Sequence, residues 1–352
     1  MHFEDGAIPE EYARHIGLKR LYVLTGLILL SLSLVWAISL GAVEAPFWAV
    51  VKTLTGAAAS KRLDLVVWNI RLPQALAAMT AGAGLAVAGA AMQSILRNPL
   101  GSPFTLGISH AAAFGAAFSV MILGGGVMTS SGAVSIADPY LATASAFLCS
   151  LLAAGAIVLI SRLRSASPET MVLAGVALGA LFTAGTMFLQ YFADDVQLAA
   201  MVFWTFGDTA RASWSELGLI AAVTLACSAY FMANAWNYNA IDAGDETAKG
   251  LGVRVERVRL VGMLLSSLLT ASIISFLGII GFVGLVAPHM VRRVIGADHR
   301  YLLPATFVTG ALLLLLSDTA ARLILAPHVL PVSVLTAFMG APVFLYLIAR
   351  GR

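Results

Sequence analysis

Ten apolar stretches, each close to the length that crosses a lipid bilayer, constrain this chain more than any other feature. A transmembrane helix needs roughly 17–25 mainly apolar residues, because the hydrocarbon core is about 30 Å thick. The expected spans cover residues 21–43, 72–95, 104–125, 139–161, 170–193, 215–235, 258–280, 282–297, 302–325 and 332–349. Only glycines around Gly281 separate the seventh span from the eighth. The segment Val196–Phe206 is too short to cross and is expected to form a re-entrant or interfacial helix.

Composition agrees with an all-α integral membrane protein. Of the 352 residues, 60% are hydrophobic and 11% are charged, against about a quarter charged in soluble domains. Segments such as "AGAGLAVAGAA" are rich in small residues, which allow helix backbones to approach closely in lipid. We expect one transmembrane domain, residues 21–349, after a cytoplasmic segment of residues 1–20. The net charge of +3 comes from scattered basic residues, so nucleic acid is not an expected partner.

The distribution of basic residues predicts the orientation, because cytoplasmic loops are enriched in Lys and Arg. With the N-terminus inside, fifteen of the 21 lysines and arginines face the cytoplasm. The six that fall outside are Lys52, Lys61, Arg62, Arg71, Arg211 and Arg322. Both termini are therefore expected in the cytoplasm.

One cytoplasmic loop, residues 236–257, is unusual because it leads into the charged stretch "GDETAKGLGVRVERVR" (Gly244–Arg259). Asp245 is a suitable N-cap, Glu246 places negative charge in a first helical turn, and Lys249 lies near the helix end. Gly252 suits the left-handed position after a helix C-terminus. The pattern predicts a helix of about two turns, which is marginal alone and needs packing or a partner. A solvated connector is the alternative.

The chain cannot hydrolyse ATP through a P-loop, because no lysine follows a glycine as the G-x-x-x-x-G-K-[ST] motif requires. Powered transport would therefore draw on ions or on another subunit. Ion-coupled carriers usually keep acidic residues inside spans, and here only Asp318 is clearly intramembrane, with Arg322 one turn away. An ion-coupled secondary transporter is thus the weaker alternative, and a non-transporting scaffold or sensor is another.

Several long motifs, in order along most of the chain, resemble the FecCD-type permease family of ABC importers for iron-siderophores, haem and cobalamin. They are "IRLPQALAAMTAGAGLAVAGAAMQSILRNPLGSPFTLGIS", "MVLAGVALGALF", "GIIGFVGLVAPHMVRRVIGADHRYLLP", "LSDTAAR" and "GAPVFLYLI". The resemblance implies a type II ABC importer permease fold with about ten transmembrane helices per subunit. It also implies a homodimer around a central path, two cytoplasmic ATPase subunits that bind ATP-Mg, and an extracytoplasmic binding protein, all at the cytoplasmic (inner) membrane.

The same resemblance assigns residues to three tasks and implies no catalytic residue, metal site or cofactor on this chain. The ATPase-coupling residues would be Asp245, Glu246, Ala248, Lys249, Leu251 and Gly252. Arg71 and Arg322 would dock carboxylates of the binding protein, with Asp318 holding Arg322. The translocation path would be lined by Gln190, Gln197, Met201, Trp204 and Phe206. Gln74 departs from the family, in which many members have an arginine there.

Several further residues have two interpretations. Arg292, Arg293 and Arg300 would add ATPase contacts or anchor the protein at the membrane surface. His110 would contact a metal or haem in the cargo, or be satisfied locally, and His289 is expected to be structural. An iron-chelate (siderophore) is the expected cargo, and haem or cobalamin are the alternatives within the family.

Overall fold

The computed structural model describes residues 10–41, 45–56, 60–123, 126–128, 134–136, 138–163 and 167–349. Its helices in the first half are α1 (Glu10–Ser39), α2 (Phe47–Leu54), α3 (Lys61–Val66), α4 (Leu72–Ile95), α5 (Ile108–Ile122), α6 (Pro139–Arg162) and α7 (Pro168–Phe192). The second half has α8 (Asp195–Thr205), α9 (Trp214–Ala233), α10 (Ala235–Asp242), α11 (Asp245–Gly250), α12 (Val255–Leu277), α13 (Val283–Ile295), α14 (His299–Leu323) and α15 (Val332–Ala349). A π-helical turn η1 (Val67–Arg71), a 3₁₀ turn η2 (Thr209–Arg211) and a short antiparallel hairpin, β1 (Gly126–Met128) with β2 (Val134–Ile136), complete the described elements.

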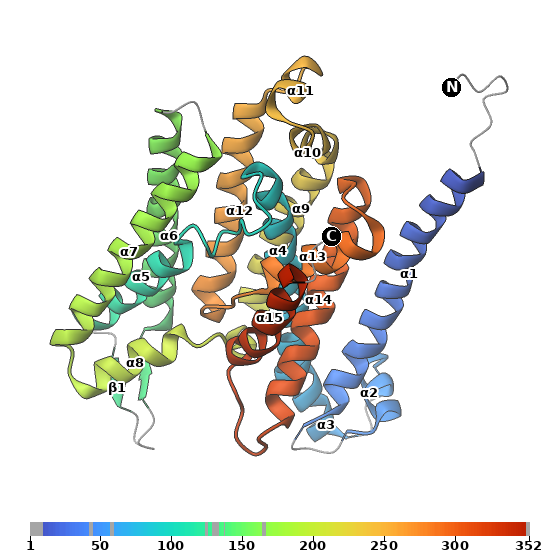
Figure 1. Cartoon of the computed structure of the whole chain (residues 1–352). Helices are drawn as coiled ribbons and strands as arrows, with labels where there is room; N and C mark the ends of the chain where they lie inside the picture. Colours follow the sequence, from blue (N-terminus) through green and yellow to red (C-terminus); the bar gives the residue numbers. More distant parts are fainter. Residues whose placement is uncertain are drawn as a thin grey trace.

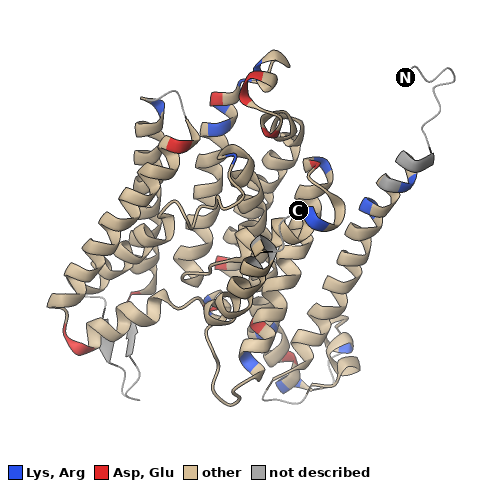
Figure 2. Ribbon diagram, in the orientation of Figure 1, with Lys and Arg blue, Asp and Glu red and all other residues tan. Residues whose placement is uncertain are grey.

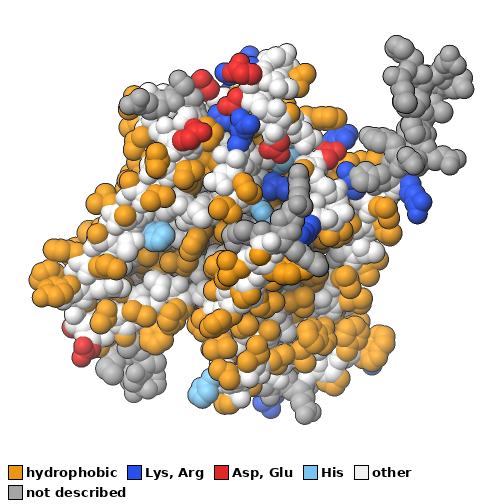
Figure 3. Space-filling model, viewed as in Figure 1, with side chains coloured by type: hydrophobic (Ala, Val, Ile, Leu, Met, Phe, Trp, Pro, Cys, Tyr) orange, Lys and Arg blue, Asp and Glu red, His pale blue; other side chains and the backbone are white. Residues whose placement is uncertain are grey.

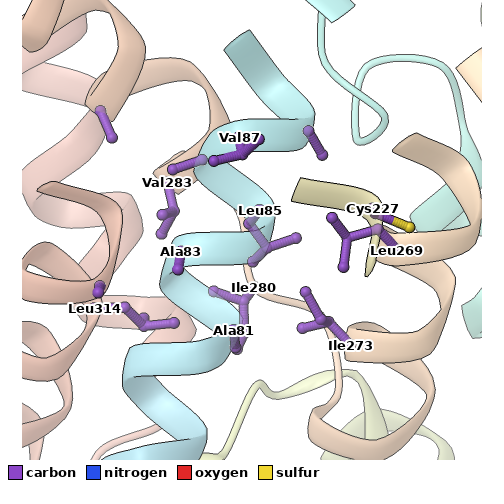
Figure 4. Close-up of a cluster of buried hydrophobic side chains, with 14 of the residues drawn as sticks. Ala81, Ala83, Leu85, Val87, Cys227, Leu269, Ile273, Ile280, Val283 and Leu314 are labelled. Carbon is purple, nitrogen blue, oxygen red and sulfur yellow. The ribbon is translucent and has the colours of Figure 1, made fainter. Parts of the chain in front are cut away.

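Helix α4 is the centre of the bundle and contacts α9, α12, α13 and α14. Figure 1 shows α1 at one side of the molecule and α5, α6 and α7 at the other. Side chains of α4 pack against those of α12, α13 and α14 (Figure 4), with the small Ala81 and Ala83 followed along the helix by the larger Leu85 and Val87.

Glycines allow the backbone of α4 to lie close to the backbones of α13 and α14. A Cβ atom added to Gly89 would overlap the carbonyl oxygen of Gly284 in α13, and one added to Gly82 would overlap that of Gly310 in α14. Small residues permit such backbone contact between helices in lipid, where dispersion contacts drive association. The close helix packing expected from the small residues is therefore seen where α4 meets α13 and α14.

Seven of the described helical segments are long and apolar enough to cross a membrane. They are Ile16–Ser39, Lys61–Ile95, Pro139–Arg162, Pro168–Phe192, Trp214–Ala233, Val255–Leu277 and His299–Leu323. The expected spans 72–95, 139–161, 170–193, 215–235 and 258–280 match helices within three residues at each end. Figures 2 and 3 show charged residues mainly at the two ends of the bundle and hydrophobic side chains between them.

Three expected spans need correction. The span 282–297 is helix α13, whose 13 residues extend only about 20 Å at 1.5 Å per residue, too short to cross alone. The break before it comes earlier than expected, because Gly278 has φ +77° and Phe282 has φ +66°. The span 104–125 shortens to the 15 residues of α5, since Gly107 with φ +81° starts the helix late. The helix that holds the span 21–43 is α1, which begins at Glu10 and ends at Ser39, and its apolar segment covers Ile16–Ser39.

Candidate functional site

Helix α11 is the predicted short cytoplasmic helix, and it lies at the same end of the bundle as the N-terminus of α1 (Figure 1). It has six residues, and the preceding loop also contains the separate helix α10, which the sequence analysis did not predict. The Val253 amide donates to the Ala248 carbonyl and the Gly252 amide to the Lys249 carbonyl, each at 2.9 Å. This pair of bonds closes the helix as a Schellman motif, with Gly252 at φ +81°.

The two faces of α11 differ in burial. Ala248 is fully buried, whereas Leu251 is 70% exposed. Lys249 Nζ and Glu246 Oε1 form an exposed ion pair of 2.9 Å, which contributes little to stability. An exposed leucine beside a charged pair is a surface suited to a protein partner.

The prediction that Asp245 is the N-cap of this helix is wrong. The N-cap position is Gly244, with φ +119°, a backbone conformation that favours glycine, and no side chain caps the helix. Asp245 is the first helical residue, and its carboxylate accepts from the Nη2 of Arg259 in α12 at 3.0 and 3.1 Å. The Asp245 carboxylate thus bonds to α12 and does not cap α11.

Arg259 is the anchor of α11, and the sequence analysis did not single it out as functional. Its side chain is 2% exposed, and its Nε donates to the carbonyl of Ile95 at the C-terminus of α4 at 2.9 Å. One buried guanidinium therefore joins α11, α12 and α4. The sequence did contain a signal for this role: Arg259 is the fifth residue of the apolar helix α12. A charged residue inside a span usually faces the interior of the bundle.

A second polar cluster joins α10 to the start of α14. His299 is fully buried and lies 2.8 Å from Ser94 Oγ of α4 and 3.0 Å from Asn239 Oδ1 of α10. Burial opposes ionisation of the neighbouring Asp298, but hydrogen bonds from Arg300 and Asn239 hold the pKa of this carboxyl at about 2. The start of α14 is therefore bound firmly to α10.

The basic residues at this end have different environments. Arg300 pairs with Asp298 at 2.6 Å and stacks over Trp236 at 4.3 Å, and Arg293 is exposed. Arg292 instead donates a hydrogen bond to Gln93 of α4. His289 is partly buried in α13 beside Pro288.

At the opposite end, the two arginines expected to dock a binding protein are turned inward. Arg71 is buried and donates to the Ile38 carbonyl at 2.8 Å. Arg322 donates to Asp318 Oδ2 at 3.1 Å and to the carbonyls of Ala37 and Leu40 at 3.3 and 3.4 Å. Both guanidiniums therefore cap the C-terminus of α1, whose last carbonyls lack helical partners.

Asp318 is the centre of this outer network. It accepts from Arg322, from Thr209 of η2 and from Gln74 Nε2, the last at 3.2 Å. Gln74, which departs from the family pattern, thus supplies a neutral donor to a carboxylate that already has a charged partner. The ion pair expected between Asp318 and Arg322 is confirmed.

The expected path residues do not share one surface. Met201 and Trp204 are buried against α5 and neighbouring segments. The Gln197 side chain closes a capping box with Asp194 at the start of α8. Gln190 and Phe206 are partly exposed. Phe206 lies beside the break before α13, where it pairs with Ile279 in an isolated parallel bridge.

His110 lies in a groove between α5 and α7 with a volume of about 450 Å³. The walls are mostly small residues, including Gly107, Gly175 and Gly179. The Nδ1 of His110 has no hydrogen-bond partner among the described residues. The local satisfaction expected for this histidine is therefore not seen at that nitrogen.

The apolar helical bundle, with the short charged helix α11 anchored at one end, is that of a multi-pass membrane protein. Residues 29–350 match the model of the FecCD transport family, and the chain belongs to that family. It is thus an ABC importer permease and a multi-pass protein of the inner membrane.

Known proteins resemble it over nearly the whole chain. A protein of Methanocaldococcus jannaschii named "Putative ABC transporter permease protein MJ0087" is 53% identical, over 97% of this chain and 98% of the relative. The hemin transport system permease protein HmuU of Yersinia pestis is 37% identical, over 93% and 94%. A solved structure described as "An inward-facing conformation of a putative metal-chelate type ABC transporter" is 30% identical, with a TM-score of 0.81 over 93% of this chain and 98% of that one. Other relatives are named as import permeases for Fe(3+)-citrate, molybdate and vitamin B12.

Proposed function

We propose that this chain carries an iron-chelate of the siderophore type across the membrane as the permease subunit of an ATP-driven importer. In this proposal two copies form a homodimer around the path, and an extracytoplasmic binding protein delivers the cargo. Two cytoplasmic ATPase subunits bind ATP-Mg and supply the energy, and this chain binds no cofactor. Both termini lie in the cytoplasm, although residues 1–9 and 350–352 are outside the described residues.

The observation that carries the proposal is the anchoring of α11 by Arg259. A short helix with an exposed Leu251 offers a contact to an ATPase, and the hydrogen bonds of Arg259 connect that contact to α4 and α12. A displacement of α11 is therefore passed to the central helix, whereas a flexible loop would absorb it. The coupling role covers Asp245, Glu246, Ala248, Lys249, Leu251 and Gly252, of which Asp245 acts through Arg259 and Ala248 through packing.

The proposed path is weakly polar. Gln190, Gln197 and Phe206 are the expected lining residues that remain partly exposed. The groove beside His110, between α5 and α7, has an apolar, glycine-rich wall. A wall with few charged ligands suits a bulky chelate better than a bare cation, which needs several oxygen or nitrogen donors.

Haem is a second candidate cargo, favoured by His110. An imidazole nitrogen without a partner, in a groove with small walls, can contact a flat metal complex, because neutral imidazole is a common metal ligand. The similarity to a hemin permease supports the same cargo. Cobalamin is supported only by the similarity of this chain to a protein named as a vitamin B12 import permease.

Reconstitution tests the proposal. The chain, its ATPase subunits and its binding protein are placed in liposomes, and uptake of a radiolabelled ferric siderophore and of haem is measured with and without ATP. We expect ATP-dependent uptake of the siderophore that persists in the presence of a protonophore. Greater uptake of haem would favour the second cargo.

The same experiment excludes the rival classes. Uptake by the chain alone that collapses with a protonophore would establish an ion-coupled transporter. A complex that neither takes up cargo nor shows cargo-stimulated ATP hydrolysis would indicate a scaffold or sensor.

A further inference from the structure

A small polar cavity lies at the cytoplasmic end of the bundle, separate from the exposed face of α11. It is lined by Gln93, Arg97, Asn98, Pro99, Asp242 and Arg292 and has a volume of about 270 Å³. Its walls come from the C-terminus of α4, the turn after it, the end of α10 and the last turn of α13. Figure 2 shows acidic and basic residues gathered around α10 and α11 at this end.

The cavity carries more positive than negative charge. Two guanidiniums, from Arg97 and Arg292, and one carboxyl, from Asp242, line it. Neither arginine forms an ion pair with Asp242 within 4.0 Å among the described residues, and Arg97 only reaches Asp245, at 4.0 Å. The positive groups are thus incompletely neutralised by the protein itself.

A buried amide group gives an independent indication of a ligand. Gln93 is 3% exposed and lines the cavity. Its Oε1 accepts from Arg292, but its Nε2 has no hydrogen-bond partner among the described residues. A buried donor without an acceptor is costly, and an acceptor in the cavity would remove that cost.

We propose that this cavity binds a small inorganic oxyanion from the cytoplasm, such as phosphate. Guanidinium groups bind phosphate oxygens with paired, charge-assisted hydrogen bonds, and Gln93 Nε2 supplies a neutral donor. A water molecule occupies about 30 Å³ in the liquid, so the cavity has room for a polyatomic anion with part of its hydration shell.

Asp242 is the one carboxyl group among the described residues that line the cavity, and its side chain is 35% exposed. Partial desolvation raises the pKa of this carboxyl, although a hydrogen bond from Ser94 and the charges of Arg292 and Arg97 act in the opposite direction. The cavity also lies near the first residue of α11, because Arg97 lines the cavity and its Nη1 is 4.0 Å from Oδ1 of Asp245. An oxyanion in the cavity therefore competes with Asp245 for Arg97.

Equilibrium dialysis of the purified full-length chain in detergent with radiolabelled inorganic phosphate tests the proposal, at ionic strength held constant with sodium chloride. We expect saturable binding that approaches one phosphate per chain, and competition by sulfate. Linear, unsaturable uptake would overturn the proposal. The assay requires no transport, so its failure and the failure of the proposed importer are distinguishable.

Three variants locate the site. Asn98→Asp keeps the oxygen that accepts from the Leu100 amide but adds a negative charge to the cavity wall. We expect it to weaken phosphate binding by about tenfold or more, because like charges placed together strongly oppose association. Arg97→Gln, at a half-exposed side chain, should weaken binding similarly. Arg293→Gln removes an exposed guanidinium outside the cavity and should leave binding unchanged. Equal losses in all three variants would show non-specific attraction and overturn the assignment.

Discussion

Arg259, which is buried, and Asp245, which is partly exposed, form an ion pair with Nη2 3.0 Å from Oδ1 and 3.1 Å from Oδ2. The arginine is 2% exposed and the aspartate 28%. Because the same guanidinium donates to Ile95 of α4, the pair connects the surface helix α11 with the centre of the bundle. It is the physical link on which the proposed coupling depends.

Asp245→Asn tests the energy of this link. The substitution leaves the buried charge of Arg259 without its anion, and removing one partner of a buried pair costs roughly 3–5 kcal/mol. We expect a clear fall in the unfolding temperature of the detergent-solubilised chain. The double variant Asp245→Asn with Arg259→Met should be less destabilised than the sum of the two single variants, because it leaves no charge unpaired. Additive losses would show that the two side chains are not energetically coupled.

Leu251→Asp tests the contact surface of α11. Leu251 is 70% exposed, so the change should leave insertion and stability intact. We expect ATP-driven uptake to fall to background while the ATPase subunits keep their basal hydrolysis, because a buried aspartate opposes packing against the ATPase. Leu163→Asp is the matched control, at a leucine that is 79% exposed at the end of α6. Normal uptake by the Leu251 variant would remove the coupling role of α11.

Arg322→Glu distinguishes a structural role from docking. The substitution places a second carboxylate beside the buried Asp318 and removes the hydrogen bonds from Arg322 to the carbonyls of α1. We therefore expect the free energy of unfolding to fall by roughly 3–5 kcal/mol. The measurement is thermal unfolding without any binding protein. Arg62→Glu, at an exposed residue of α3, serves as the control of equal charge change. An unchanged unfolding temperature, together with weaker binding-protein affinity at low salt, would instead support docking by Arg322.

Gly89→Ala tests the packing of α4 on α13. The added Cβ would overlap the Gly284 carbonyl, and overpacking of a tight core costs roughly 1–3 kcal/mol. Gly218→Ala in α9 is the control, since nothing lies within 4 Å of its added Cβ. That change should stabilise by about 0.5–1 kcal/mol, because alanine favours a helix more than glycine. Thermal unfolding of both variants measures the contrast, and equal effects would contradict the close helix contact.

Local pattern was sufficient for most helices and for the position of α11. Apolar length predicted α4, α6, α7, α9 and α12, and Gly252 predicted where the short helix stops, whereas its predicted N-cap, Asp245, is the first helical residue. Local pattern was insufficient where a change in backbone conformation ends a helix. The chain around Gly281 is apolar throughout, so the positive φ angles of Gly278 and Phe282, which make α13 a half-length helix, leave no hydropathy signal.

The sequence by itself determined that this chain is a helical membrane protein, because hydrocarbon thickness and backbone hydrogen bonding leave helices as the solution for such apolar runs. Its ordered motifs, and not its hydropathy, placed it in the permease family. Only the tertiary structure decided which buried polar groups meet. Arg259 bonds to a carbonyl 164 positions away, and Arg322 to carbonyls 282 and 285 positions away. Such partners are set by which helices become neighbours in the bundle. The same packing brings Arg71 and Arg322 to the carbonyls at the end of α1, and it places Arg259 where it anchors α11.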